Sequence, residues 1–301
     1  MNTERTKRPQ LDSMSLDHGK RARLHRLLYE YGPGQGTMLV LPVDQGLEHG
    51  PMDFLPNPPS ENPEFQIRMA IDGGYSAIAF HYGIAARYLA PHAGKIPLIL
   101  KINGSTSIPP ADRAFSGMTA RVEDAVRLDA AAIGYTLYVG SPRQDEDIAQ
   151  LTAVRAECDR YGMPLVIWSY PRGEAIDKKG GRDSLFAVDY AARVATELGA
   201  DVIKLNVPVF DQKSKEGSPK PYNTMVLEYR EAVEKVVRSA GQAFVLFSGG
   251  GKIGDADLLE KARLVMQAGA TGLIFGRNMW QRPMAEALRL TAEIKRLMLE
   301  E

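Results

Sequence analysis

The sequence predicts an α/β fold in which eight parallel strands alternate with eight helices and close into a (β/α)8 TIM barrel, preceded by an N-terminal helical extension. Short apolar runs recur along the chain, and each is followed by a stretch with helical spacing. Several of these helical stretches end in a glycine or proline signal, such as Gly162-Met163-Pro164. Eight such units in 301 residues match this barrel. An open doubly wound sheet is the competing fold, but no Gly-x-Gly-x-x-Gly motif follows the first strand.

Residues 1–37 form the predicted extension. Residues 1–18 are polar and mixed in charge, which is typical of a flexible or surface arm. Residues 19–31 have helical spacing, and a Gly-Pro-Gly sequence ends this helix. Since no linker of low complexity divides residues 38–301, we expect them to form one catalytic barrel domain.

The remaining elements follow in order along the chain. The predicted strands are short and almost entirely apolar, and they cover residues 38–43, 76–80, 97–102, 131–135, 165–170, 201–206, 243–247 and 271–275. The predicted helices cover residues 63–72, 83–90, 119–128, 144–161, 184–198, 224–240, 255–268 and 283–301. Near-continuous apolar strands alternating with helices indicate a parallel sheet with both faces covered.

Composition excludes several classes of protein. Lys plus Arg and Asp plus Glu both number 37, so no broad basic field invites nucleic acid. The single cysteine, Cys158, excludes an intramolecular disulfide and fits a reducing compartment. The N-terminus carries no apolar targeting segment, and no apolar run approaches membrane-spanning length. We therefore expect a cytoplasmic protein with neither a nucleic-acid nor a membrane partner.

One lysine interrupts the strand predicted at residues 201–206. Because side chains alternate along a strand, Lys204 and Asn206 face away from the apolar side that carries Ile203 and Leu205. If helices cover that side, Lys204 lies inside the barrel, where an unpaired charge costs several kcal/mol. Burial lowers the pKa of a lysine, and the neutral amine attacks a carbonyl to form a Schiff base. A lysine in this position therefore either performs chemistry or pairs with a buried carboxylate.

Other polar residues end strands at the rim where barrels of this type place catalysts. Asp44 ends the first strand, and its carboxylate either shuttles a proton or orients the amine, or else pairs with a lysine. Lys101 ends the third strand; it lowers the pKa of Lys204, contacts substrate, or forms a salt bridge to Asp44. From the fifth strand, Tyr170 can move a proton beside an iminium, and Trp168 either stacks on a sugar or belongs to the core.

Glycine-rich loops follow the seventh and eighth strands, after which such barrels hold phosphate. Glycines let backbone N–H groups approach an anion, and a following helix adds positive potential. Arg277, and Arg172 after the fifth strand, would add charge-assisted contacts. The alternative interpretation is that the glycine-rich loops are ordinary turns and that Arg172 is an ordinary surface arginine. The predicted phosphate-binding residues are Ser248, Gly249, Gly250, Gly276, Arg277 and Arg172.

A metal site is the weaker alternative. Asp44, Glu48, His49 and His81 together supply ligands suited to a metal ion, but no spacing enforces such a site. Structural hydrogen bonding is the preferred interpretation of Glu48 and His49. We therefore predict no metal and no other cofactor.

Seven motifs carry a resemblance that spans nearly the whole chain after residue 37. They are LPVDQGLEHGP (41–51), LILKING (98–104), IGYTLYVGS (133–141), WSYPRG (168–173), VIKLN (202–206), VLFSGG (245–250) and FGRNMWQRP (275–283). On these motifs the chain resembles the class I fructose-bisphosphate aldolases of archaeal and bacterial type, the DhnA-like group.

The resemblance implies reversible cleavage of fructose 1,6-bisphosphate to dihydroxyacetone phosphate and glyceraldehyde 3-phosphate, a reaction of glycolysis and gluconeogenesis. It implies Lys204 as the Schiff-base lysine, Tyr170 as proton donor and acceptor, and Asp44 as the assisting carboxylate. It also implies phosphate binding by the two glycine loops, a (β/α)8 barrel, independence of metal, and a homo-oligomer.

Two alternatives to this function stay open at this point. One is a related Schiff-base enzyme acting on another phosphorylated sugar, or in the synthesis of a heptulosonate precursor of aromatic compounds. The other is a non-catalytic barrel that binds a sugar phosphate. The loop at 207–222 is a candidate lid, and whether it supplies a further carboxylate to catalysis is not fixed by its sequence.

Overall fold

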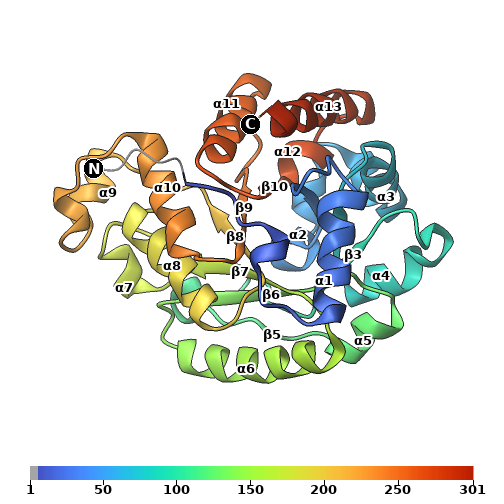
Figure 1. Ribbon diagram of the computed structural model, residues 1–301, viewed down its shortest axis with the longest axis horizontal. Coiled ribbons are helices and arrows are strands. Elements are labelled where there is room, and N and C mark those ends of the chain that lie inside the picture. Colours follow the sequence, from blue (N-terminus) through green and yellow to red (C-terminus); the bar gives the residue numbers. More distant parts are fainter. Residues whose placement is uncertain (1–5, 301) are drawn as a thin grey trace.

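A computed structural model describes residues 6–300 and contains a closed parallel barrel (Figure 1). Going round the barrel, the strand order is β1-β10-β9-β8-β7-β6-β3-β2. The eight predicted strands are all present, so the predicted fold class is confirmed. Their bounds are β1 (Met38–Pro42), β2 (Ala77–His81), β3 (Leu98–Lys101), β6 (Ala132–Val139), β7 (Leu165–Pro171), β8 (Val202–Asn206), β9 (Phe244–Ser248) and β10 (Gly272–Ile274).

The barrel closes where its first strand pairs with its last. Met38 of β1 lies opposite Gly272 of β10 in the parallel ladder. A Cβ atom on Gly272 would lie 1.8 Å from the carbonyl oxygen of Met38. Only glycine lets the two backbones approach this closely, so Gly272 is required for closure.

The principal helices cover the outside of the barrel (Figure 1). They are α3 (Pro63–Asp72), α4 (Tyr82–Tyr88), α5 (Val122–Arg127), α6 (Gln144–Tyr161), α8 (Leu185–Glu197), α10 (Tyr229–Ser239), α11 (Asp255–Gln267) and α13 (Met284–Glu300). Short helices stand in the loops: α2 (Gln45–Glu48), α7 (Glu174–Asp177), α9 (Gln212–Gly217) and α12 (Arg277–Trp280). A small hairpin, β4 (Asn103–Gly104) with β5 (Gly117–Met118), follows β3.

Two element boundaries differ from the prediction by more than three residues, each for a local reason. The helix predicted from residue 224 begins at Tyr229, because Glu228 and Glu231 form a capping box at that point. The strand predicted at 131–135 continues to Val139, where its backbone pairs with Pro171 of β7. The carboxylate of Asp147 accepts a hydrogen bond from the backbone N–H of Tyr138 and supports this extra length.

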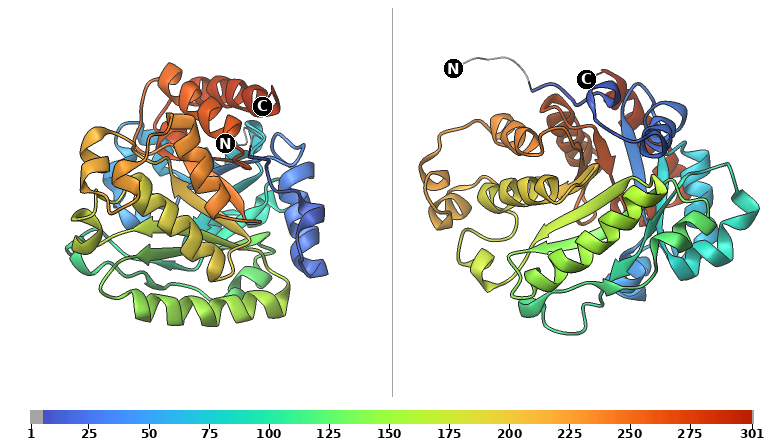
Figure 2. Two further views of the ribbon diagram at one scale, coloured as in Figure 1. Left: turned by 60° about the vertical axis from the view of Figure 1, so that its left-hand side comes forward. Right: turned by 60° about the horizontal axis from the view of Figure 1, so that its bottom comes forward.

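The N-terminal extension closes the bottom of the barrel, opposite the carboxyl ends of the strands. Helix α1 (His18–His25) and the π-helical turn η2 (Arg26–Glu30) lie against this end of the barrel (Figure 2, blue). Lys20 pairs with Asp201, at 3.0 Å, directly before β8. One apolar cluster joins the extension to the barrel interior; it includes Leu11, Met14, Leu24, Leu27, Leu28, Val40, Val166 and Val202.

Residues 6–18 lie mostly on the surface, as one form of the prediction for residues 1–18 expected, but two apolar side chains fix them to the barrel. Residues 1–5 lie outside the described part. Leu11 and Met14 are buried, and the Arg8 side chain donates a hydrogen bond to the backbone oxygen of Ala270. The segment is mostly polar, so its composition does not indicate that Leu11 and Met14 pack against the barrel.

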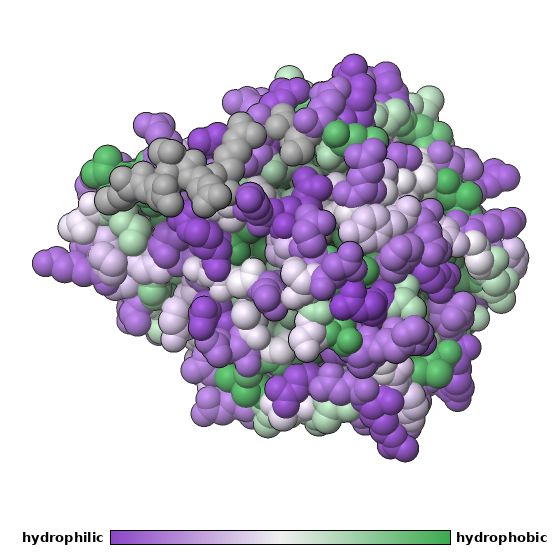
Figure 3. Space-filling model, in the orientation of Figure 1, coloured by the Kyte–Doolittle hydropathy of each residue, from purple (hydrophilic) through white to green (hydrophobic). Residues whose placement is uncertain are grey.

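The face shown in Figure 3 is covered mainly by hydrophilic side chains. None of the helices within residues 6–300 is long and apolar enough to cross a membrane.

Candidate active site

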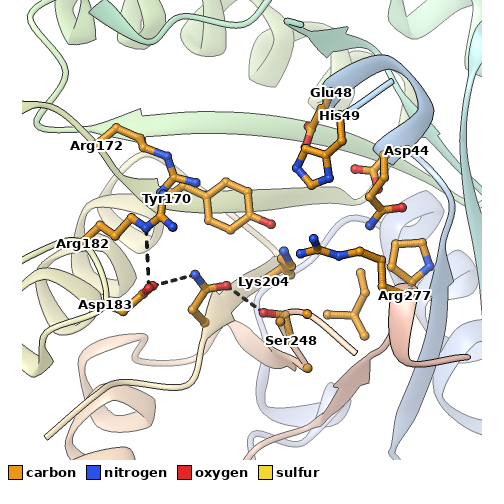
Figure 4. A pocket seen from close by; sticks show the side chains of 18 residues that line it. Asp44, Glu48, His49, Tyr170, Arg172, Arg182, Asp183, Lys204, Ser248 and Arg277 are labelled. Atoms are coloured by element: carbon orange, nitrogen blue, oxygen red, sulfur yellow. Dashed lines mark hydrogen bonds and ion pairs between the residues drawn. The ribbon is translucent and has the colours of Figure 1, made fainter. Parts of the chain in front are cut away.

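A cavity of about 390 Å³ opens at the carboxyl ends of the strands (Figure 4). We call it the rim cavity. It lies where the fold class predicts chemistry, and it is lined by residues from β1, β7, β8, β9 and the segments that follow these strands and β10. Most of the predicted site residues line it: Asp44, Tyr170, Arg172, Lys204, Ser248, Gly249, Gly250, Gly276 and Arg277.

Lys204 reaches the floor of the rim cavity from the middle of β8. Its neighbours across the ladder are Trp168 of β7 and Leu246 of β9, and its side chain is only 7% exposed. Burial is the main reason that the pKa of Lys204 is lowered to about 8; the Asp44 and Glu48 carboxylates oppose this shift, and the positive charges of Lys101 and Arg277 add to it. The amine is therefore neutral far more often than that of an exposed lysine.

Tyr170 stands directly beside this amine. The Nζ atom of Lys204 lies 4.2 Å from the centroid of the Tyr170 ring, and the guanidinium carbon of Arg172 lies 5.1 Å from the same centroid. The tyrosine thus lies between the amine and an arginine at the cavity wall (Figure 4). A group bonded to Lys204 would lie next to the phenol, which is the place of a proton donor and acceptor.

Two carboxyl groups occupy the opposite side of the amine. Asp44 ends β1 and is almost fully buried, with its Oδ2 4.0 Å from the Nζ of Lys101. Glu48 follows one helical turn later on α2, and its Oε1 is buried with no hydrogen-bond partner. Burial and the charge of Asp44 raise the pKa of Glu48. The sequence favoured a structural role for Glu48, but its unpaired oxygen lies in the cavity wall.

Lys101 and Trp168 lie beneath the rim cavity and do not line it. Both are fully buried; the Lys101 amine donates a hydrogen bond to Thr136 Oγ1 at 2.5 Å and lies 4.6 Å from the centroid of the Trp168 ring. Gly134 makes room for them, because a Cβ there would lie 2.8 Å from Lys101 and 2.9 Å from Trp168. Packing against Gly134 keeps both side chains out of the lining of the rim cavity in this structure, and their contact with substrate stays a prediction.

The two glycine loops face each other at the end of the cavity nearest Arg277. Gly250 has a φ of +73° with open space around it, so its backbone is free to approach an anion. Asn278 braces this loop by donating to the carbonyl oxygen of Gly251 and accepting from the N–H of Ile253. Arg277 begins the short helix after β10 and lines the same end.

Sequence reasoning missed three residues of the wall on the other side. Arg182 and Asp183 come from the segment before α8, far along the chain from any strand end, so the strand-end rule could not find them. Asn206 was placed on the inward face, and that alternation was a usable signal. The amide Nδ2 of Asn206 donates to Asp183 Oδ1 at 2.7 Å, and Ser248 Oγ donates to Asn206 Oδ1 at 2.7 Å.

A second cavity of about 590 Å³ adjoins the first. The two share Glu48, His49, Tyr170, Arg172 and Arg182. Arg113 and Arg143 line the second cavity only, so that its walls carry four guanidinium groups. Positive charge therefore lies at both ends of the combined space, at Arg277 and at the arginine-rich end.

The segment 207–222 does not line the rim cavity. Its backbone pairs with the segment before α8, where the N–H of Val209 donates to the carbonyl oxygen of Asp183. Its acidic residues act locally, since Asp211 caps α9 and Glu216 accepts a hydrogen bond from Gln212. The lid predicted here is thus not closed over the site in this structure.

Within residues 6–300, no three or more His, Cys, Asp or Glu side chains are grouped as a metal ion requires. His49 instead pairs with Asp53 at 2.7 Å.

The chain is similar in sequence to several known proteins. Residues 38–282 match the family model described as DeoC/LacD family aldolase. The chain is 38% identical over 249 residues to the fructose-bisphosphate aldolase class 1 of Thermoproteus tenax, which covers 82% of this chain and 85% of the relative. It is also 32% identical to the 2-amino-3,7-dideoxy-D-threo-hept-6-ulosonate synthase of Halobacterium salinarum, over 88% of this chain and 86% of the relative.

Solved structures are similar as well. An archaeal fructose-1,6-bisphosphate aldolase, with its catalytic lysine covalently bound to the carbinolamine intermediate, matches with a TM-score of 0.77 and 34% identity. The match covers 92% of this chain and 98% of that chain.

Proposed function

The chain belongs to the DeoC/LacD family of aldolases, and from this premise we propose that it is a class I fructose-bisphosphate aldolase. It cleaves fructose 1,6-bisphosphate reversibly to dihydroxyacetone phosphate and glyceraldehyde 3-phosphate through a Schiff base. The observation that carries the proposal is the buried Lys204 amine, with a pKa of about 8, beside Tyr170 in a cavity with cationic ends. The likeness to relatives and structures named fructose-bisphosphate aldolase supports the choice of substrate.

In the synthetic direction, neutral Lys204 attacks the ketone carbon of dihydroxyacetone phosphate, and loss of water gives an iminium. The iminium draws electrons from the adjacent carbon, so Tyr170 can remove a proton there and leave an enamine. The enamine carbon attacks the aldehyde, and hydrolysis of the resulting iminium frees Lys204. Asp44 assists because its carboxylate stabilises the positive charge of the amine and of the iminium next to the reacting carbon.

The bisphosphate is held at its two ends. The backbone N–H groups of residues 248–250 and the Gly276–Arg277 turn bind the phosphate of the ketone half, because they face the cavity beside Lys204. Arg172 and Arg182 lie at the junction with the second cavity and bind the phosphate of the aldehyde half.

Lys101 contributes from beneath the floor. Its ammonium lies 4.0 Å from Asp44 and balances that carboxylate. The positive charge of Lys101 therefore offsets part of the pull of Asp44 and Glu48 on Lys204 and favours the neutral amine. Trp168 lies opposite Lys204 in the β7–β8 ladder, and its ring contacts the Lys101 amine.

A second candidate function is a Schiff-base aldolase acting in heptulosonate synthesis. The similarity to the Halobacterium salinarum synthase favours it, since that relative matches 88% of the chain at 32% identity. The four arginines of the adjoining cavity favour the bisphosphate instead. A substrate panel separates the two, and it also separates both from a non-catalytic barrel that binds a sugar phosphate.

The test is borohydride reduction in the presence of dihydroxyacetone phosphate, followed by peptide mass mapping. We expect a stable adduct on the peptide that contains Lys204 and none in Lys204→Met. An adduct on another lysine, or none in the unmodified protein, would remove the proposal. A non-catalytic barrel would keep its affinity for the ligand in Lys204→Met.

The oligomeric state and the cellular location stay predictions that rest on family membership. We propose a homo-oligomer in the cytoplasm, working in glycolysis or gluconeogenesis, with a barrel domain that starts at residue 38. Sedimentation of the purified chain tests the first of these.

A further inference from the structure

Three residues form a hydrogen-bonded row along one wall of the rim cavity (Figure 4). Asp183 comes from the segment before α8, Asn206 ends β8, and Ser248 ends β9. Asp183 accepts from the Asn206 amide at 2.7 Å, and the Asn206 carbonyl accepts from Ser248 at 2.7 Å. The mechanism above uses the backbone of residue 248 but none of these three side chains.

The chemistry of Asp183 fixes the direction of every hydrogen bond in the row. A carboxylate only accepts hydrogen bonds, so the NH₂ end of the Asn206 amide must face Asp183. The carbonyl end of the amide then faces Ser248, and Ser248 must donate its single proton to it. The Ser248 oxygen is left with lone pairs alone to offer to the cavity.

The backbone holds the row in place. The N–H of Val209 donates to the carbonyl oxygen of Asp183, and the bridge between Ser184 and Val209 ties the segment before α8 to the segment after β8. Asn206 and Ser248 lie opposite each other in the β8–β9 ladder. The second oxygen of Asp183 has only a long contact, 3.7 Å, to Arg182. The row is therefore preorganised and still has acceptor capacity toward the cavity.

Such a wall discriminates between two kinds of ligand group. A phosphate group also accepts hydrogen bonds, so it is repelled by the acceptors of the row and belongs with the glycine loops and arginines. A hydroxyl group donates one hydrogen bond and accepts others, and it can use both the free lone pairs and the remaining N–H of Asn206. The row thus suits a hydroxyl on a carbon chain that passes between two phosphates.

We propose that the Asp183–Asn206–Ser248 row recognises the hydroxyl of the aldehyde half of the substrate, and that Asp183 is the positioning residue that sets its polarity. The aldehyde half is chosen because Arg182, adjacent to Asp183, lines both cavities, whereas the ketone half is bound to Lys204 with its phosphate near Arg277. The inference rests on the proposed function and adds to it a preference for aldehydes with a hydroxyl next to the carbonyl carbon.

The experiment compares two aldehydes in condensation with dihydroxyacetone phosphate. One is glyceraldehyde 3-phosphate, and the other is 3-oxopropyl phosphate, which lacks only the 2-hydroxyl. In the unmodified enzyme we expect kcat/KM to be about tenfold or more higher for the hydroxylated aldehyde, as one satisfied hydrogen bond provides. In Ser248→Ala and in Asp183→Asn the ratio falls to within about threefold, because only the hydroxylated aldehyde loses a contact.

Asp211→Asn is the matched control, since Asp211 is an exposed carboxylate outside the cavity, and we expect its ratio to be unchanged. Equal losses for both aldehydes in Ser248→Ala and Asp183→Asn, or an unmodified enzyme that does not discriminate, would overturn the proposal. Trapping with dihydroxyacetone phosphate alone precedes the aldehyde, so an adduct on Lys204 in every variant shows that the lysine site is intact. Absence of that adduct in the unmodified enzyme would instead remove the proposed function and this inference with it.

Discussion

Replacing Lys101 by methionine tests how the floor of the site controls the charge of the Lys204 amine. Methionine has similar length and no charge. Removing one partner of a buried charge pair costs about 3–5 kcal/mol when the other charge is left alone, but Asp44 keeps its interaction with the Lys204 amine. We expect the Lys101→Met barrel to fold, because the space beside Gly134 and Trp168 accommodates an unbranched chain. We expect the pKa of Lys204 to rise, since Asp44 loses the ammonium that lies 4.0 Å from it.

The size of the effect follows from the charges that surround Lys204. Asp44, Glu48, Lys101 and Arg277 all act on this amine, and burial is the largest cause of its pKa of about 8. Two unit charges about 12 Å apart interact by about 1.4 kcal/mol at an effective dielectric constant of 20. Lys101 and Lys204 both point into one barrel, so a rise of about one in the pKa is a conservative expectation.

The consequence for rate depends on pH. At a pKa of about 8, roughly a tenth of the Lys204 side chains are neutral at pH 7. At a pKa of about 9 the neutral fraction is roughly a hundredth, so kcat/KM at pH 7 falls about tenfold. At pH 10 both proteins are largely neutral at this lysine, and the variant recovers to within about twofold.

The assay is the pH profile of kcat/KM for cleavage of fructose 1,6-bisphosphate, together with the pH dependence of borohydride trapping. Burial also lowers the pKa of Lys101, against the charges of Asp44, Glu48 and Asp147. A Lys101 that is neutral in the folded protein would leave the profile where it is. An unshifted acid limb, or an equal loss at every pH, would therefore refute the reasoning. Thr136→Val, which removes the hydrogen bond to Lys101, should shift the limb in the same direction by less.

Three further perturbations test other parts of the structure. Tyr170→Phe should lower kcat by about 10²–10⁴ while the Lys204 adduct still forms; a variant that neither turns over nor traps would place the defect in binding, and unchanged turnover would exclude Tyr170 as the proton carrier. His81 is held neutral in the fold, where burial and Lys101 lower its pKa to about 4. The stability that neutral His81 contributes is fully present above pH 6.5, the pKa of the unfolded state, and is lost as the pH falls toward 4. The free energy of unfolding should therefore fall by up to about 3 kcal/mol in this window, and by less in His81→Phe. Equal pH dependence of the two proteins in urea titrations would contradict this. Gly134→Ala should cost about 1–3 kcal/mol by overpacking Lys101 and Trp168, whereas Gly83→Ala, in open space on α4, should be neutral or stabilising by up to about 1 kcal/mol; equal melting temperatures for the two variants would show that the floor tolerates a methyl group.

The sequence alone determined the parts of this protein that depend on local pattern. Apolar runs and helical spacing predicted the strands and the helices around them, and α3 and α6 begin and end where they were predicted. Alternation along β8 predicted that Lys204 faces inward with Val202, and both are buried inside the barrel. These features were readable because the periods of helix and strand fix which face each side chain occupies.

Only the tertiary structure decided how deep each side chain lies and which distant segments meet. The strand-end rule placed Lys101 at the rim near Lys204, but packing against Gly134 put Lys101 beneath the floor and left Lys204 at the cavity. The cavity wall opposite Arg277 forms because the segments around Asp183 and Val209 pair through their backbones, and no sequence pattern near either residue predicts this pairing. Depth and adjacency depend on the register of strands far apart in the chain, whereas sequence periodicity specifies only the direction of a side chain.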